Sequence, residues 1–127
     1  MILETTFIID LLRGKKDAVE MANRLDKENV PLFSTSVTVF ELWQGLNTEK
    51  RETEERLVDF VEKFGFLHLD VESAKQGGKI QRGLIDKGIK IDPEDCMIAG
   101  IALHHSMPII TRDAHFSRIK GIKIETY

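Results

Sequence analysis

The stretch Ile2-Leu3-Glu4-Thr5-Thr6-Phe7-Ile8-Ile9-Asp10-Leu11-Leu12 near the N-terminus contains the pattern that decides the fold class. Its first part, residues 2–5, is a short apolar run that ends in polar residues, as a buried strand does. Its second part, residues 7–12, is an apolar cluster with helical spacing that stops at Gly14. The stretch therefore predicts a strand, a turn and a short helix.

Helical and strand-like segments alternate along the rest of the chain. Helices are expected at residues 17–27, 37–46 with Ser36 as the N-cap, 47–64, 73–87, and from the start signal Asp92-Pro93-Glu94-Asp95 to Leu103. Strands are expected at residues 31–35, 66–69, 109–111 and 123–126. Short apolar strands that alternate with helices predict an α/β fold, in which helices cover both faces of a parallel sheet.

The composition narrows the class of protein. A chain of 127 residues with 42% hydrophobic residues has the length of one compact domain, so a single domain over residues 1–127 is expected. The single cysteine excludes an intrachain disulfide, and no apolar run is long enough to cross a membrane. Acidic residues interrupt the N-terminal apolar stretch, which argues against a secretory signal. These features predict a soluble, cytoplasmic protein.

Four acidic residues fall where parallel strands end or on the helix nearby. Glu4 ends the first strand, Glu41 lies on the helix after the second, Asp95 opens the helix before the fourth, and Asp113 follows the fourth. Ligands of open α/β sheets bind at the carboxyl ends of the strands. Carboxylates that converge there repel one another unless a cation is present, and oxygen ligands favour Mg²⁺ or Mn²⁺. The placement predicts a divalent-metal site.

Three of the four acids, taken alone, also have a simpler explanation. Asp95 is at a position where it stabilises a helix N-terminus, Asp113 can cap a turn, and Glu41 can be an ordinary surface residue. Asp10 is expected to be structural or exposed. Only the joint placement of the four acids favours a functional site.

The net charge of −3 does not by itself indicate a nucleic-acid-binding protein. The chain contains neither a GxxxxGK[ST] nor a GxGxxG motif, which argues against a phosphate-binding loop. Glu4 is followed by Thr5-Thr6, so the acid pair of a signalling receiver and the Asp-x-Asp of a haloacid-dehalogenase phosphatase are both missing.

Four segments in order resemble the PIN-domain family, in particular the small VapC-type toxins of prokaryotic toxin–antitoxin pairs. The opening stretch is similar to the family's first strand, and Phe40-Glu41-Leu42 to the segment with its internal glutamate. Asp95-Cys96-Met97-Ile98-Ala99-Gly100-Ile101-Ala102 resembles its most specific motif, an Asp ahead of an Ile-Ala-x-x-Ala helix. Thr111-Arg112-Asp113-Ala114-His115-Phe116 resembles its C-terminal Thr-Arg-Asp/Asn pattern. The resemblance extends from Met1 to at least Phe116.

The resemblance implies a three-layer α/β/α sandwich with a central parallel sheet of four or five strands. It also implies a Mg²⁺- or Mn²⁺-dependent endoribonuclease that is inhibited by a VapB-type antitoxin and forms a homodimer. A PIN-like domain that binds RNA or a partner with little catalysis is the alternative.

The resemblance further assigns roles to individual residues. Glu4, Asp95 and Asp113 are expected to hold metal, and Glu41 to be a ligand or the base that orients water. The hydroxyls of Thr6 and Thr111 are expected to hold these groups in place. Proximity in sequence to these residues, rather than the resemblance, gives the expectation that substrate phosphates meet four basic residues: Arg13, Lys15, Lys16 and Arg112.

Glu4 departs from the family, which usually carries aspartate at this position. The extra methylene places the carboxylate about 1.5 Å further from the backbone. The longer side chain either misplaces the carboxylate or is accommodated by a site adapted to it.

Overall fold

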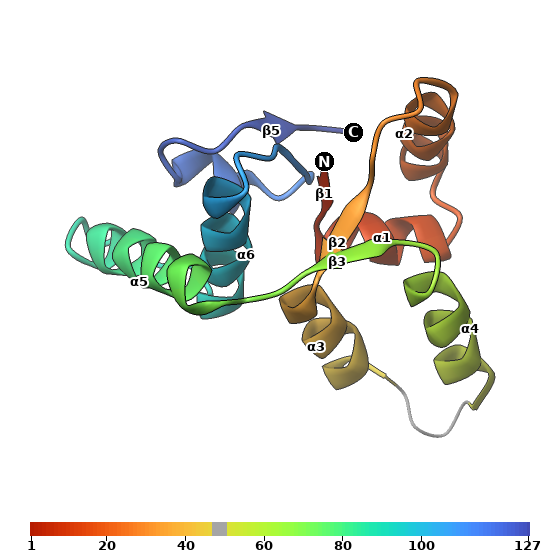
Figure 1. Ribbon diagram of the computed structural model, residues 1–127, viewed down its shortest axis with the longest axis horizontal. Coiled ribbons are helices and arrows are strands. Elements are labelled where there is room, and N and C mark those ends of the chain that lie inside the picture. The colour runs from red at the N-terminus through yellow and green to blue at the C-terminus, as the bar shows by residue number, and fades with distance from the viewer. Residues whose placement is uncertain (47–50) are drawn as a thin grey trace.

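The computed structural model describes residues 1–46 and 51–127 (Figure 1). Within these residues the strands are β1 (Ile2–Leu3), β2 (Phe33–Thr35), β3 (Gly65–Leu67), β4 (Ile109–Ile110) and β5 (Ile124–Glu125). The helices are α1 (Thr5–Leu12), α2 (Lys16–Lys27), α3 (Ser36–Gln44), α4 (Arg51–Val61), α5 (Val71–Ile85) and α6 (Pro93–His104), followed by the 3₁₀ helix η1 (Ala114–Arg118). The helical start expected at residues 47–50 lies outside the described residues.

The five strands form one parallel sheet in the order β3-β2-β1-β4-β5. Strand β1 is central: Ile2 pairs with Phe33 of β2 and with Ile109 of β4. The carboxyl ends of β1 and β4 therefore lie side by side, although more than 100 residues of chain separate them. The predicted parallel sheet is confirmed, with five strands.

Helices pack on both faces of this sheet, because successive side chains of a strand point to opposite faces. Ile2 and Ile109 belong to one buried cluster, which includes Ile98 and Ile101 of α6. Their neighbours Leu3 and Ile110 belong to a second cluster with side chains of α1, α2, α3 and α4. Figure 1 shows α5 and α6 on one side of the strands and α1, α2 and α4 on the other. The expected three-layer α/β/α arrangement is confirmed.

Two helix starts differ from the prediction. No turn separates β1 from α1, because Glu4 is itself the N-cap and its carboxylate accepts a hydrogen bond from the Thr6 backbone N–H at 2.9 Å. The N-cap of α3 is Thr35, not Ser36: the Thr35 hydroxyl accepts a hydrogen bond from the Thr38 N–H at 3.0 Å. The Ser36 hydroxyl instead accepts one from the Leu69 N–H at 3.1 Å, which ties α3 to the chain after β3.

Helices α5 and α6 pack closely because glycines stand at their crossing. A Cβ atom at Gly100 would lie 2.3 Å from the Ser73 carbonyl oxygen and 2.6 Å from the Gly77 nitrogen. A Cβ at Gly77 would lie 2.8 Å from the Cys96 carbonyl oxygen. The two backbones thus pack at a distance that leaves no room for a methyl group, and this packing fixes the position of α6 against the sheet.

Among residues 1–46 and 51–127, no helix has both the length and the apolar character needed to cross a membrane.

Candidate active site

The four predicted acids are brought together at the carboxyl edge of the sheet. Glu4 follows β1 and is buried, Glu41 is on α3, Asp95 is in the first turn of α6, and Asp113 caps η1 after β4. Carboxylate oxygens of Asp95 and Asp113 lie within 4.8 Å of each other and of a nitrogen of His115. We call Glu4, Glu41, Asp95 and Asp113 the acid cluster.

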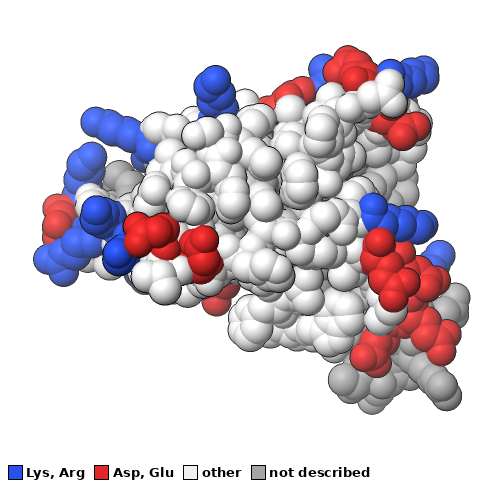
Figure 2. Space-filling model, viewed as in Figure 1, with Lys and Arg blue, Asp and Glu red and all other residues white. Residues whose placement is uncertain are grey.

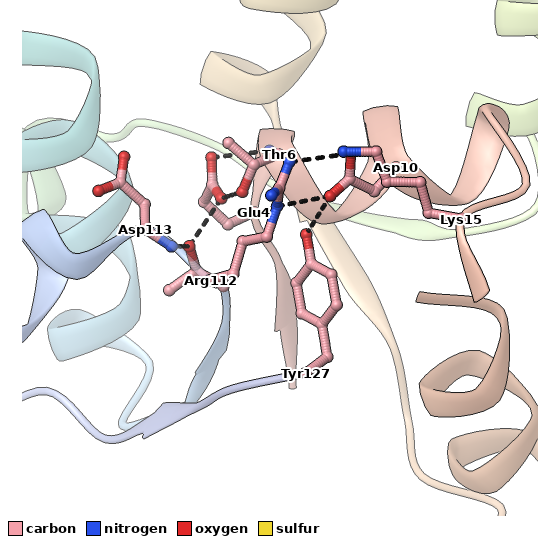
Figure 3. Close-up of polar contacts among 8 residues, drawn as sticks. Glu4, Thr6, Asp10, Lys15, Arg112, Asp113 and Tyr127 are labelled. Atoms are coloured by element: carbon pink, nitrogen blue, oxygen red, sulfur yellow. Dashed lines mark hydrogen bonds and ion pairs between the residues drawn. The ribbon is translucent and has the colours of Figure 1, made fainter. Parts of the chain in front are cut away.

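Glu4 is held in one position by two threonines (Figure 3). Its Oε1 accepts the Thr6 backbone N–H, and its Oε2 accepts hydrogen bonds from the Thr6 hydroxyl and, at 2.9 Å, from the Thr111 hydroxyl. The Thr111 hydroxyl oxygen also accepts a hydrogen bond from the Asp113 backbone N–H at 2.9 Å. The structure thus brings both predicted threonines to Glu4, and Thr111 links Glu4 to the backbone of Asp113.

Glu41 is oriented by a residue that the sequence analysis did not identify. The Thr5 hydroxyl donates to Oε2 of Glu41 and lies 3.3 Å from the Thr38 hydroxyl. Glu41 also lines a cavity of about 330 Å³ between α1, α3 and α4, whose wall includes Arg13. Glu41 therefore lies near the other acids of the cluster and also lines an open cavity.

The ionisation of Glu4, Glu41 and Asp95 reflects their burial and, after it, the crowding of negative charge. Burial and the charges of Glu4, Asp113 and Glu41 raise the pKa of Asp95 to about 7. Burial also raises the pKa of Glu4, although hydrogen bonds from Thr6 and Thr111 oppose this. The pKa of Glu41 is raised by burial and by the charge of Glu4, against the hydrogen bond from Thr5. In the absence of a cation, the fold thus favours protonation of these acids.

The acid cluster suits a hard divalent cation. Its donors are carboxylate oxygens from separate elements, and a bound cation would offset the burial and the repulsion that raise the pKa values of Glu4, Glu41 and Asp95. His115 adds a nitrogen donor: its Nδ1 lies 3.2 Å from Oδ1 of Asp113. In the sequence, the spacing Asp113-Ala114-His115 could have indicated His115 as a donor beside Asp113, but the same spacing is equally typical of a capped turn. Asp113 does cap this turn, since its Oδ1 accepts the His115 N–H at 2.8 Å.

Asp92 is a further acid near the acid cluster, and the sequence predicted it only as part of a helix start. The helix begins at Pro93 as expected, but the Asp92 side chain makes no capping hydrogen bond there. Its charge instead raises the pKa of both Asp95 and Glu41. Asp92 therefore adds to the negative potential beside the acid cluster.

The predicted basic residues have different surroundings. Arg112 and Lys15 are both paired with Asp10, at 2.6 Å and 2.8 Å, and each keeps about half of its side chain exposed. Lys16 is highly exposed and lies 3.7 Å from Glu20. Asp10 was expected to be structural or exposed. It is a buried structural residue, because only 1% of it is exposed.

Comparisons with known proteins agree with this architecture. The chain is 29% identical to "tRNA(fMet)-specific endonuclease VapC" of Salmonella typhimurium, over 98% of this chain and 96% of that protein. It is 27% identical to "Ribonuclease VapC1" of Methanocaldococcus jannaschii, over 100% of this chain and 86% of that protein.

Two solved structures have the same fold. DNA-bound VapBC from Salmonella typhimurium superposes with a TM-score of 0.85 at 26% identity, covering 98% of this chain and 96% of that one. VapBC2 from Rickettsia felis bound to a promoter DNA fragment gives a TM-score of 0.88 at 20% identity, with 99% and 97% covered. The family model for the PIN domain matches residues 1–122, and the chain therefore belongs to the PIN-domain family.

Proposed function

We propose that this protein is a divalent-metal-dependent endoribonuclease and the toxin of a toxin–antitoxin pair. The observation that carries the proposal is the convergence of the acid cluster, in which neighbouring carboxylates and burial raise the pKa of Asp95 to about 7. Such crowding is costly to folding and is typical of sites that bind a cation. The names of the VapC relatives support RNA as the substrate.

The acid cluster would hold Mg²⁺ or Mn²⁺, with Glu4, Asp95 and Asp113 as ligands and His115 as a further donor. When bound, the ion supplies positive charge against the scissile phosphate and lowers the pKa of water. Thr6 and Thr111 fix the Glu4 carboxylate, so the ligand set is in place before substrate arrives.

Glu41 is suited to the role of proton acceptor or ligand. Its Oε2 is fixed by the Thr5 hydroxyl, and its raised pKa brings its basicity closer to neutral pH. We propose that it orients the attacking water and accepts a proton from it. The water oxygen bonds to phosphorus as the bond to the 3′ oxygen of the upstream nucleotide breaks. The 3′ oxygen takes up a proton from solvent, which leaves a 3′-hydroxyl and a 5′-phosphate.

The direct test is cleavage of a labelled tRNA by the purified protein. With Mn²⁺ or Mg²⁺ we expect products that carry 5′-phosphate and 3′-hydroxyl ends, and with EDTA we expect none. Folded protein that binds tRNA and Mn²⁺ but cleaves with neither ion would instead favour the alternative of a PIN-like binding domain.

We further propose that a VapB-type antitoxin is the partner of this protein. The DNA-bound VapBC structure from Salmonella typhimurium, 26% identical to this chain, supports such a partner. Co-expression with the protein encoded by the adjacent reading frame is expected to give a complex that no longer cleaves RNA. Undiminished RNA cleavage in the presence of that protein would contradict the proposal.

A homodimer is proposed from the exposed apolar side chains. Leu42 and Leu57 are buried, but Phe40 is 56% exposed and Val58 39% exposed on the neighbouring helices α3 and α4. A two-fold contact is the commonest way to cover such surface. Light scattering at micromolar concentration is expected to give twice the chain mass of 14.5 kDa. A mass near that of one chain at all concentrations would refute the dimer.

Shortening Glu4 tests the departure from the family pattern. Glu4→Asp keeps the charge but withdraws the carboxylate from the Thr111 hydroxyl, which now lies 2.9 Å from Oε2. Because both oxygens are fixed by threonines, the structure favours a site adapted to glutamate. We expect roughly tenfold slower Mn²⁺-dependent cleavage. An increase in the measured rate would mean that the longer side chain misplaces the carboxylate.

A further inference from the structure

Asp10 is a buried carboxylate with a full set of donors, outside the acid cluster. Its Oδ1 contacts Lys15 Nζ at 2.8 Å and Arg112 Nη2 at 3.2 Å. Its Oδ2 contacts Arg112 Nε at 2.6 Å and accepts the Tyr127 hydroxyl at 3.0 Å. We call Asp10, Lys15, Arg112 and Tyr127 the Asp10 network.

The Asp10 network lies beside the acid cluster. Arg112 stands between Thr111, which donates to Glu4, and Asp113. Figure 3 shows the Arg112 side chain crossing in front of Glu4 and Thr6 to reach Asp10 rather than turning toward Asp113. Arg112, in the loop that follows β4, thus connects the acid cluster with the Asp10 network.

The network carries excess positive charge at a half-exposed position. Two cations share one buried anion, and the side chains of Lys15 and Arg112 are 45% and 49% exposed while that of Asp10 is 2% exposed. The two-point contact of Asp10 with Nε and Nη2 fixes the plane of the Arg112 guanidinium. Fixed, partly exposed cations on a buried anchor form a preorganised site for an anion.

We propose that the Asp10 network is a binding site for an RNA backbone phosphate next to the scissile one. Lys15 and Arg112 contact the phosphate, and Asp10 acts as a positioning residue that holds both cations in place. The ligand class rests on the proposed ribonuclease function, since an RNA strand at the acid cluster would place its neighbouring phosphates along this edge.

The distribution of charge supports a local site of this kind. The chain has a net charge of −3. On the face shown in Figure 2, basic and acidic side chains mostly lie next to one another in small groups around a large uncharged area. A chain with this net negative charge would hold a polyanion through individual, well-placed cations rather than through its overall charge.

Replacing Asp10 by asparagine separates positioning from overall charge. Asp10→Asn makes the protein less negative, so general electrostatics predicts tighter RNA binding. Loss of the anchor predicts the opposite, because Lys15 and Arg112 are no longer held. We expect fluorescein-labelled tRNA, measured by anisotropy in EDTA to prevent cleavage, to bind Asp10→Asn roughly tenfold more weakly.

Variants of the cations keep the test valid if Asp10→Asn fails to fold. Lys15→Gln and Arg112→Gln change half-exposed side chains, and each is expected to weaken tRNA binding several-fold and to lower the salt slope by about one. Lys75→Gln is the matched control. Lys75 makes an ion pair of the same 2.8 Å length with Glu72 on α5, and its loss is expected to leave tRNA binding unchanged.

The results distinguish this inference from the proposed function. Wild-type binding in folded Asp10→Asn, or in both cation variants, would overturn the inference and make Asp10 a structural anchor only. An equal loss in Lys75→Gln would also overturn it, in favour of general electrostatics. Cleavage in Mn²⁺ is measured separately. If the variants bind tRNA more weakly but the wild-type protein never cleaves RNA, the ribonuclease function alone is refuted.

Discussion

Asp95→Asn is expected to lower metal-dependent RNA cleavage by a factor of about a hundred or more and, at the same time, to stabilise the metal-free protein above neutral pH. The substitution is nearly isosteric, but it removes a carboxylate charge from the acid cluster. Loss of one charge-stabilising group in an active site commonly costs a factor of about 10² to 10³. The opposite effects on activity and stability distinguish a functional acid from a structural one.

The stability gain follows from the pKa of Asp95, which burial and neighbouring acids raise to about 7. Between the ordinary pKa and this value the folded state binds more protons than the unfolded state, so wild-type stability falls as pH rises through this range. Asparagine has no such dependence. The difference in melting temperature between Asp95→Asn and wild type should therefore grow from about pH 4 to pH 7.

Calorimetry of Mn²⁺ binding and thermal melts across pH measure both effects. Mn²⁺ should raise the melting temperature of wild type at high pH more than that of Asp95→Asn, because only the intact site gains the full binding free energy. Asp92→Asn removes the same charge from a residue one turn earlier and should affect cleavage much less. Equal Mn²⁺ affinity in wild type and Asp95→Asn would exclude Asp95 as a ligand.

Gly100→Ala is expected to destabilise the fold by about 3 kcal/mol or more. The added Cβ would lie 2.3 Å from the Ser73 carbonyl oxygen and 2.6 Å from the Gly77 nitrogen, and both atoms belong to backbone that cannot rotate away. Helices α5 and α6 would have to separate, which exposes the buried cluster around Ile98 and Ile101. The melting temperature should fall on the order of 10 °C.

Gly78→Ala is the matched control for Gly100→Ala. Gly78 is also helical, but a Cβ there would have no atom within 4 Å. Alanine has the higher helix propensity, so this change should stabilise by roughly 0.5–1 kcal/mol. Opposite shifts in urea midpoints are expected for the two variants. A shift of the same sign in both would mean that the glycines act through helix propensity rather than through the α5–α6 contact.

The elements of the fold were largely predictable because the strands are short apolar runs between helices with clear caps. The helix starts at Glu4 and Thr35 were not predicted correctly. Glutamate is an unusual N-cap, and serine is preferred to threonine at this position, which favoured Ser36 over Thr35. Only the tertiary partner of Ser36, the Leu69 N–H, explains why Thr35 is the cap.

Convergence of the acid cluster was predictable, because the ends of parallel strands meet at one edge. The Asp10 network was not, since Arg112 and Tyr127 are 102 and 117 residues away from Asp10 along the chain. Thr5 was missed for a local reason. Its role depends on α1 starting directly after Glu4, which aims the hydroxyl at Glu41.

The strand order has a consequence for the synthesis of this protein in a cell. Strand β1 is translated before its partner β4, which consists of Ile109–Ile110, so the middle of the sheet closes only after the residues between them have been translated. At about 5–20 residues per second, that delay is on the order of ten seconds. The acid cluster needs both Glu4 and Asp113, so the proposed nuclease site would be incomplete until the segment that follows β4 has been synthesised.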